Sequence, residues 1–251
     1  MSMVVTVDAE TLSEDQPESD DRVTAHLTCH AAIFTIVEDR LSLLLTERNQ
    51  GPFRFQWELP GSALQTDGDL EALAEQASMR LLDNVPAIRL RQLGAYGHPD
   101  RDPRHRAVAV VYWGVAASID LEAATGAEPS NARVVAISEF TSDEFRFAFD
   151  HRDIASDALR ALRRSLTQTS IATALCPPEF TISRLQKVYE VVFNTSVSAG
   201  NFHRKVRNTP GFILPAGNST RESPGKGRPP RFFQAGELVD LSSPFGFEAG
   251  P

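Results

Sequence analysis

The sequence of 251 residues has no long hydrophobic run, contains only two cysteines, and does not start with a basic segment. No stretch of about 18 consecutive apolar residues is present, so we expect no transmembrane helix. Residues 1–22 are acidic, which disfavours a signal peptide because such peptides begin with basic residues. We interpret residues 1–25 as an acidic disordered tail.

The two cysteines, Cys29 and Cys176, are far apart in the sequence, and neither belongs to a C-x-x-C motif. This spacing disfavours a zinc site or a redox motif. We expect both to be buried apolar thiols in a reducing environment, which predicts a cytoplasmic location.

Charge is unevenly distributed along the chain. Residues 151–235 contain 13 Lys or Arg and five Asp or Glu, a balance of +8 that leaves −16 for the remainder, since the net charge is −8. An excess of positive charge in one part of an acidic protein indicates contact with nucleic acid by that part alone.

Residues 52–84 combine an aromatic segment, a tight Leu59-Pro60-Gly61 turn and an amphipathic helix. Asp69 directly precedes the helical pattern and suits the N-cap position. The apolar residues of this pattern recur at intervals of three and four, which predicts a helix packed on a core. They are Leu70, Leu73, Ala74, Ala77 and Leu81.

Several β-branched and aliphatic runs around this helix predict strands. The run at 107–116 is so apolar that we expect both of its faces to be covered. The other predicted strands are residues 28–37 and 41–47, which form a hairpin, and residues 88–97 and 133–137. We therefore predict an α/β (α+β) fold in which residues 26–150 form an α/β/α sandwich.

Residues 98–106 contain two prolines and alternating Asp and Arg, which predicts a loop. Two interpretations remain open from the residues alone. The loop is either a solvated connection with surface ion pairs, or a rim that binds phosphate, because the planar guanidinium of Arg matches phosphate.

A helix of about four turns is predicted after residue 150, with Asp150 at its N-cap. We interpret residues 151–168 as a connecting helix. We expect His151 to be buried at a domain junction, where it orients a neighbour through a hydrogen bond and does not act as a catalyst.

Residues 169–235 predict a winged helix-turn-helix domain, followed by a tail at 236–251 without a pattern. A short helical segment ends before Pro177-Pro178, Thr181 caps a second helix, and a basic third helix spans 200–208, with Phe202 and Val206 as its buried pair. The alternative is an ordinary exposed basic helix. Two short strands, 212–214 and 231–234, bracket a basic loop and predict a wing.

Side chains of the third helix and the wing are candidates for DNA contact. Amide and guanidinium groups pair with base edges, so Asn201 and Arg204 are expected to read bases, while the other cations contact phosphates. The candidate DNA-binding residues are Asn201, His203, Arg204, Lys205, Arg207, Lys226, Arg228 and Arg231. One short reading helix buries little surface, so we expect a homodimer on a palindromic double-stranded site.

The segment Trp57-Glu58-Leu59-Pro60-Gly61 and the following helix resemble the entry to a Nudix box, G-x5-E-x7-R-E-U-x-E-E-x-G-U, where U is aliphatic. In that family, helix carboxylates hold Mg²⁺ against a diphosphate. Aligned from Ser62, the charged positions of the box and its late glycine fall on Gly68, Gln76-Ala77, Arg80-Leu81 and Asp83. The resemblance implies a Nudix shell without its metal site, so we predict no catalytic residue, no metal and no enzyme.

The loop at 98–106, residues 147–151 and residues 180–205 resemble one Nudix subgroup, the Nudix-related transcriptional regulators of NAD metabolism. This resemblance implies a repressor of NAD biosynthesis or salvage genes that senses ADP-ribose or a related nucleotide and requires no cofactor. The candidate effector-binding residues are Arg48, Trp57, Arg101, Asp102 and Arg104. Trp57 could stack on a base or pack in the core, with the core slightly favoured.

Two alternatives are kept. One is a Nudix-type hydrolase of ADP-ribose-like nucleoside diphosphates with a divergent metal site. The other is a regulator of the same architecture that responds to a sugar or sugar phosphate. The missing glutamates favour a regulator, because a diphosphate and Mg²⁺ together need several carboxylates.

Overall fold

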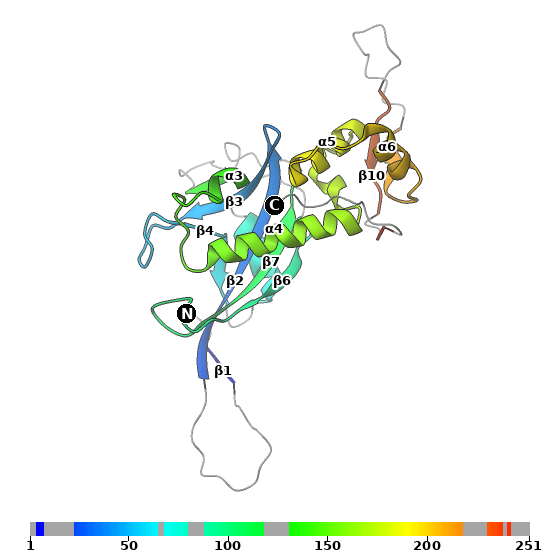
Figure 1. The fold of residues 1–251 in the computed structure, drawn as a ribbon. Coiled ribbons are helices and arrows are strands. Elements are labelled where there is room, and N and C mark those ends of the chain that lie inside the picture. The colour runs from blue at the N-terminus through cyan, green and yellow to red at the C-terminus, as the bar shows by residue number, and fades with distance from the viewer. Residues whose placement is uncertain are drawn as a thin grey trace.

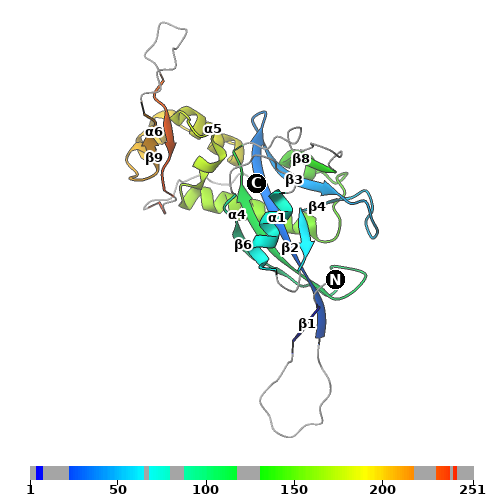
Figure 2. The same ribbon diagram turned by 180° about the vertical axis from the view of Figure 1, so that it is seen from behind.

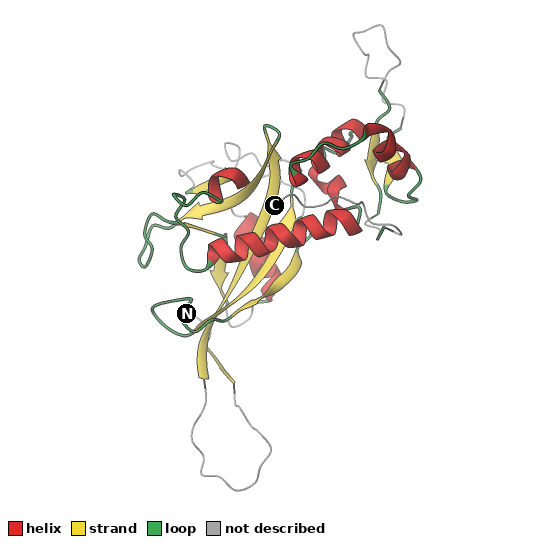
Figure 3. Ribbon diagram, viewed as in Figure 1, coloured by secondary structure: helices red, strands yellow, loops and turns green. Residues whose placement is uncertain are grey.

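A computed structural model describes residues 4–7, 23–64, 68–79, 88–117, 131–217, 230–237 and 240–241. A layered α/β unit and a smaller helical unit lie side by side (Figures 1 and 3). No helix within these ranges is long and apolar enough to cross a membrane.

One mixed sheet forms the centre of the larger unit, and β2 is its longest strand. The order is β4-β3-β2-β7-β6, with β1 and β5 also paired to β2 and β8 paired to β3. β2 and β7 run parallel, and the other pairs are antiparallel. The strands are β1 Val4–Val7, β2 Val23–Val37, β3 Arg40–Glu47, β4 Trp57–Glu58, β5 Gly61–Ala63, β6 Arg91–Tyr96, β7 Ala107–Val115 and β8 Ala132–Ala136.

Helices cover both faces of this sheet. The helix α4 (His151–Gln168) crosses the face seen in Figure 1, and α1 (Leu70–Met79) lies on the opposite face seen in Figure 2. Alternate residues of β7 enter the two cores: Val111 and Trp113 pack on the α4 side, whereas Val110 and Tyr112 pack on the α1 side. The predicted α/β/α sandwich with a doubly covered strand is therefore confirmed. One of its two helical layers is α4, which follows residue 150 and which the sequence predicted to be a connecting helix.

The smaller unit has the helices and strands expected of a winged helix domain. Thr181 caps α5, because its hydroxyl accepts a hydrogen bond from the Arg184 N–H at 3.1 Å. Phe202 and Val206, four residues apart, are buried in α6 as predicted. The elements of this unit are η1 Ile171–Leu175, α5 Ile182–Phe193, α6 Ala199–Arg207, β9 Ile213–Pro215 and β10 Phe233–Ala235. The short helix α3 Ile137–Phe140 precedes α4 and lies beside β3 and β8 of the larger unit (Figure 1).

The two units share one hydrophobic core, which runs from β2 and β7 through α4 to α5 and α6. The Tyr189 hydroxyl of α5 donates to the Leu166 carbonyl of α4 at 3.1 Å, and Arg163 Nε of α4 donates to the Val192 carbonyl at 3.2 Å. In the first turn of α5, Arg184 pairs with Asp39 of the β2–β3 turn at 3.3 Å. These contacts connect the winged helix unit to both the helix and the hairpin of the sandwich.

The prediction of a disordered tail over residues 1–25 is wrong for residues 4–7 and 23–25. Val4–Val7 forms β1 and pairs antiparallel with the first residues of β2. The acidic composition of the segment concealed a short β-branched run whose pairing partner lies beyond the acidic residues. Residues 1–3 and 8–22 lie outside the described residues, as do 238–239 and 242–251 of the predicted C-terminal tail.

Both cysteines are buried, as predicted, and neither forms a disulfide. Burial raises the pKa of the Cys29 thiol to about 11 and that of Cys176 to about 12. A thiol with a pKa this high is protonated at neutral pH and is a poor nucleophile. This is the behaviour of two small apolar core residues.

Candidate functional site

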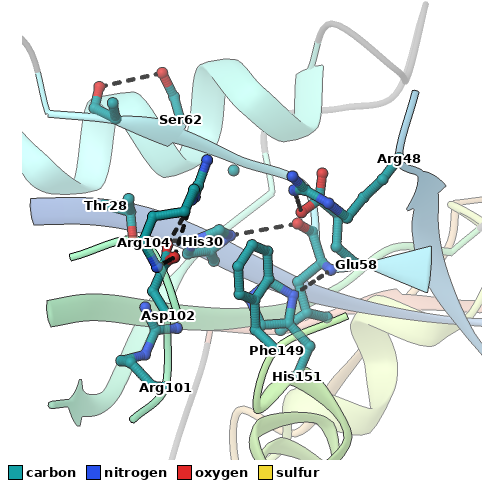
Figure 4. Close-up of a pocket in the computed structure, with 13 residues that line it drawn as sticks. Thr28, His30, Arg48, Glu58, Ser62, Arg101, Asp102, Arg104, Phe149 and His151 are labelled. Atoms are coloured by element: carbon teal, nitrogen blue, oxygen red, sulfur yellow. Dashed lines mark hydrogen bonds and ion pairs between the residues drawn. The ribbon is translucent and has the colours of Figure 1, made fainter. Parts of the chain in front are cut away.

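A pocket of about 160 Å³ opens between β2, the turn after β4, the loop at 98–106 and the first residue of α4 (Figure 4). Its lining is mostly polar and comes from segments far apart in the sequence. The polar and charged residues include Thr28, His30, Arg48, Glu58, Ser62, Arg101, Asp102, Arg104 and His151.

Two histidines, the partly buried His30 and the fully buried His151, hold the Leu59 backbone at the base of this pocket. The Leu59 N–H donates to Nδ1 of His151 at 3.0 Å, and the Leu59 carbonyl lies 3.3 Å from Nδ1 of His30. His30 Nε2 also lies 3.1 Å from the Thr28 hydroxyl. His151 therefore orients a neighbour through a hydrogen bond, as the sequence predicted.

These contacts show which ring nitrogen carries the proton in each histidine. Burial lowers the pKa of His30 to about 4 and that of His151 well below its ordinary value, so both rings are neutral at pH 7. His151 Nδ1 accepts from Leu59, and a neutral ring has one N–H, so the proton of His151 is on Nε2. His30 carries its proton on Nδ1, which donates to the Leu59 carbonyl.

Gly61 is required by this arrangement. A Cβ atom at this position would lie 2.1 Å from Nδ1 of His30 and 2.7 Å from the carbonyl oxygen of Cys29. Both distances are far below van der Waals contact, so any side chain here would displace the His30 ring. The Leu59-Pro60-Gly61 turn thus positions the histidine pair.

The Arg101 side chain forms an internal ion pair. Its side chain is almost fully buried and forms a bidentate pair with Asp150, with Nε–Oδ2 and Nη2–Oδ1 distances of 3.0 and 2.8 Å. Asp150 occupies the N-cap position of α4 as predicted, but its side chain forms no capping hydrogen bond. The carboxylate instead fastens the loop at 98–106 to the start of α4, so Arg101 supports the pocket wall.

Arg104 and Arg48 give the pocket its positive charge. Arg104 donates to Asp102 at 2.9 and 2.7 Å, yet its side chain remains 47% exposed. Arg48 pairs with Glu58 at 2.5 Å. The two guanidinium carbons lie 5.6 and 4.7 Å from the ring centroid of Phe149, so both cations contact one aromatic ring.

The pKa values of the carboxyl groups of Glu58 and Asp102 are shifted in opposite directions. Burial raises the pKa of Glu58, although its hydrogen bond from Arg48 opposes the change. Burial would also raise the pKa of Asp102, but hydrogen bonds from Arg104 outweigh burial and the pKa of Asp102 is lowered. Asp102 is therefore ionised and orients Arg104 at the mouth of the pocket.

Trp57 does not line the pocket. Its side chain is half-buried and stacks on Phe145 with ring centroids 6.2 Å apart, and its backbone N–H donates to the Arg146 carbonyl. The structure therefore brings four of the five effector candidates together at the pocket, namely Arg48, Arg101, Asp102 and Arg104. It places Trp57 in the packing beside it.

Sequence reasoning missed several lining residues as members of the site, including His30, Glu58 and Phe149. His30 is a single polar residue inside an apolar strand, and that position was the available signal. Phe149 belongs to the segment that carried the family resemblance, but its left-handed backbone, with φ of 52°, has no sequence signature.

The Mg²⁺ that enzymes with a Nudix box bind does not fit the residues that the structure describes. Gly68, Gln76 and Ala77 carry no carboxylate, and Asp69 is a helix cap whose Oδ1 accepts the Ala72 N–H at 3.0 Å. Within the described ranges, no three His, Cys, Asp or Glu side chains gather as metal ligands. The box positions 80, 81 and 83 lie outside those ranges.

A second candidate site is the exposed face of α6, on the side of the winged helix unit away from the sheet (Figure 1). Asn201, Arg204 and Arg207 are exposed, His203 and Lys205 are partly exposed, and Arg204 Nη2 donates to Asn201 Oδ1 at 3.3 Å. Arg231, beside β10, is also exposed. Lys226 and Arg228 of the predicted wing lie outside the described residues.

Comparison with known proteins agrees with this architecture. Residues 172–235 match the model of the NrtR DNA-binding winged helix domain. The chain is 27% identical over 208 residues to the ADPR responsive transcriptional repressor NtrR of Acinetobacter baylyi, covering 82% of each chain. It is 26% identical over 129 residues to the ADP-ribose pyrophosphatase of Methanocaldococcus jannaschii, covering 51% of this chain and 72% of that enzyme.

Among solved structures, the NrtR of Shewanella oneidensis in complex with a 27mer DNA has a similar fold, with a TM-score of 0.73 and 22% identity. The similarity covers 87% of this chain and 99% of that chain. The chain thus carries an NrtR winged helix domain behind a Nudix-like sandwich, which confirms its resemblance to the Nudix-related transcriptional regulators.

Proposed function

We propose that the protein is a transcriptional repressor of NAD biosynthesis or salvage genes whose Nudix-like domain binds ADP-ribose or a related nucleotide without hydrolysing it. One observation carries this proposal. A winged helix domain with an exposed basic helix is packed on a domain whose pocket presents arginines and whose box positions Gly68, Gln76 and Ala77 carry no carboxylate.

The pocket chemistry supports a nucleotide diphosphate as the effector. Arg104 is half-exposed and oriented by an ionised Asp102, and such a guanidinium binds phosphate through paired hydrogen bonds. Drug-sized ligands occupy pockets of roughly 300–1,000 Å³. A pocket of about 160 Å³ holds part of a nucleotide, such as its diphosphate, while the rest lies over the mouth.

Hydrolysis of the nucleotide is disfavoured by the residues at the box positions. Enzymes that cleave a diphosphate with Mg²⁺ use several carboxylates to hold the metal ion against the phosphates. Gly68, Gln76 and Ala77 supply none. The likeness to an archaeal ADP-ribose pyrophosphatase makes hydrolysis the second candidate function, and it extends the expectation of an ADP-ribose-like ligand to this pocket.

For DNA binding, we propose a homodimer on a palindromic duplex site. Specific binding at ~10⁻⁸ M or tighter requires more surface than one winged helix buries, and a two-fold dimer doubles it. Its half-sites would be about 10 base pairs apart, or a multiple of this spacing. Asn201 and Arg204 are assigned to base edges, and the other basic residues of α6 and the wing to phosphates.

Calorimetry with ADP-ribose tests the effector site. We expect saturable heat with the wild-type protein and a loss of affinity of at least about tenfold in Arg104→Ala, because a charge-assisted hydrogen bond is lost. Arg133→Ala is the matched control, since Arg133 is similarly exposed at 52%, forms an ion pair with Glu139, and lies outside the pocket lining. If all three proteins bind ADP-ribose with equal affinity, Arg104 does not contact the effector.

Two further assays with the wild-type protein distinguish the competing functions. If calorimetry shows heat of binding with a sugar phosphate but not with ADP-ribose, NAD or related nucleotides, the effector is a sugar phosphate and not a nucleotide. Steady release of AMP from ADP-ribose in the presence of Mg²⁺ or Mn²⁺ would establish the hydrolase. We expect binding of ADP-ribose without turnover.

A further inference from the structure

We propose that His151 contacts the bound nucleotide directly, by donating a hydrogen bond from Nε2 to a phosphate oxygen. This inference rests on the proposed function, because it assumes that a nucleotide diphosphate occupies the pocket. It adds a ligand-contacting residue to a site for which the sequence indicated only arginines, one aspartate and one tryptophan.

The first argument is the unused hydrogen-bond donor of His151. The side chain is fully buried and lines the pocket, its Nδ1 accepts from Leu59, and its Nε2 has no hydrogen-bond partner among the described residues. Buried polar atoms are almost always paired, so an unpaired one in a pocket wall indicates a partner supplied by a ligand. The tautomer fixed by Leu59 makes Nε2 a donor, and the ligand atom must therefore be an acceptor.

The second argument concerns the charge of that acceptor. Arg48 and Arg101 are close enough to His151 to act on its electrostatic environment, and both line the same pocket. A site with nearby guanidinium groups and a neutral N–H donor favours an anionic oxygen over a neutral carbonyl or hydroxyl oxygen. Of the groups in a nucleotide diphosphate, only the phosphates carry such oxygens.

The third argument concerns a neighbour of the ring whose backbone is strained. His30 and Phe149 both contact the His151 ring, with centroid distances of 4.7 and 5.6 Å. His30 is held by Leu59 and Thr28, whereas Phe149 has a left-handed backbone with φ of 52°. Strained residues of this kind are concentrated at ligand sites and switch regions. Nε2 is shielded from solvent, so the proposed contact requires a neighbouring ring to shift when the phosphate binds, and we assign this shift to Phe149.

The position of His151 gives this contact a consequence. His151 is the first residue of α4, and the last turns of the same helix contact α5 through Leu166–Tyr189 and Arg163–Val192. A helix transmits displacement along its axis as a rigid element. A phosphate that binds His151 therefore acts on the helix that supports the DNA-binding unit.

Two substitutions separate the roles of the two ring nitrogens. His151→Asn places an amide near the position of Nδ1, which keeps an acceptor for Leu59 but removes the donor at Nε2. His151→Gln places an amide near Nε2, which keeps the donor but removes the acceptor. We expect calorimetry with ADP-ribose to show at least about a tenfold loss of affinity in His151→Asn and a smaller loss in His151→Gln. Circular dichroism melting verifies that each variant is folded.

Wild-type affinity in a folded His151→Asn variant would refute the inference and leave the proposed function intact. An absence of heat with the wild-type protein would refute both. If neither variant folds, ¹⁵N-histidine NMR of the wild-type protein decides the question. The Nε2 resonance of His151 should shift when ADP-ribose is added, and an unchanged resonance at saturation would refute the contact.

Discussion

Lowering the pH from 7.5 to 5 should destabilise the protein, because His30 and His151 are neutral rings in the folded protein. The ordinary pKa of His30 is 6.5, and burial lowers it to about 4 in the folded protein. Between these values the unfolded chain binds a proton that the folded protein does not bind. Stability is therefore fully present above pH 6.5 and is lost as the pH falls toward 4.

The magnitude follows from the difference between the two pKa values. One pKa unit corresponds to about 1.4 kcal/mol, so His30 alone should lower the free energy of unfolding by about 2 kcal/mol at pH 5. The pKa of His151 is lowered in the same direction, so its contribution adds to the loss. Because few carboxylates are protonated at pH 5, most of the measured change should come from histidines.

Urea denaturation followed by circular dichroism at pH 7.5, 6 and 5 measures this change. His30→Asn retains an amide that can donate to the Leu59 carbonyl and does not titrate, so its stability should depend less steeply on pH. An NMR titration of the wild-type histidine rings provides a test that does not require a folded variant. The reasoning would be refuted if the His30 resonance titrated near pH 6.5 in the folded protein.

Further predictions concern DNA recognition, the contact between the units, and the turn beneath the pocket. In gel-shift titrations at two salt concentrations, Arg204→Ala should weaken specific binding by about 1–3 kcal/mol and non-specific binding much less. Lys205→Ala should weaken both alike and reduce the salt slope by about one, and wild-type behaviour of both variants would mean that α6 is not the recognition helix. Asp39→Asn should change the free energy of unfolding in urea by at most about 1 kcal/mol, because its ion pairs with α5 are partly exposed, and a larger loss would show a stronger contact between the units. Gly61→Ala should destabilise the protein by about 1–3 kcal/mol or more in the same assay, because its Cβ would overlap the His30 ring, and wild-type stability would contradict that geometry.

Features governed by neighbours in the chain were predicted from the sequence. Asp69 caps α1 through an N–H three residues away, and Thr181 caps α5 in the same manner. The spacing of Phe202 and Val206 identified the buried face of α6, and the apolar run at 107–116 identified a strand covered on both faces. In each case the deciding interaction joins residues a few positions apart, or depends on the pattern of apolar residues.

Features that require a distant partner were decided by the tertiary structure. Arg101 and Arg104 belong to one loop and look alike in the sequence, but only Arg101 meets Asp150, 49 residues away, and becomes buried. Val4–Val7 reads as part of an acidic tail until β2 provides a pairing partner.

The pocket is also a feature that only the tertiary structure decided. Its base is the backbone of a single residue, Leu59, held by one histidine 29 residues before it and by another 92 residues after it. The sequence indicated that His151 orients a neighbour, but it could not identify that neighbour or show which ring nitrogen carries the proton. Both depend on burial and on hydrogen-bond partners that meet only after the sheet and α4 have packed together.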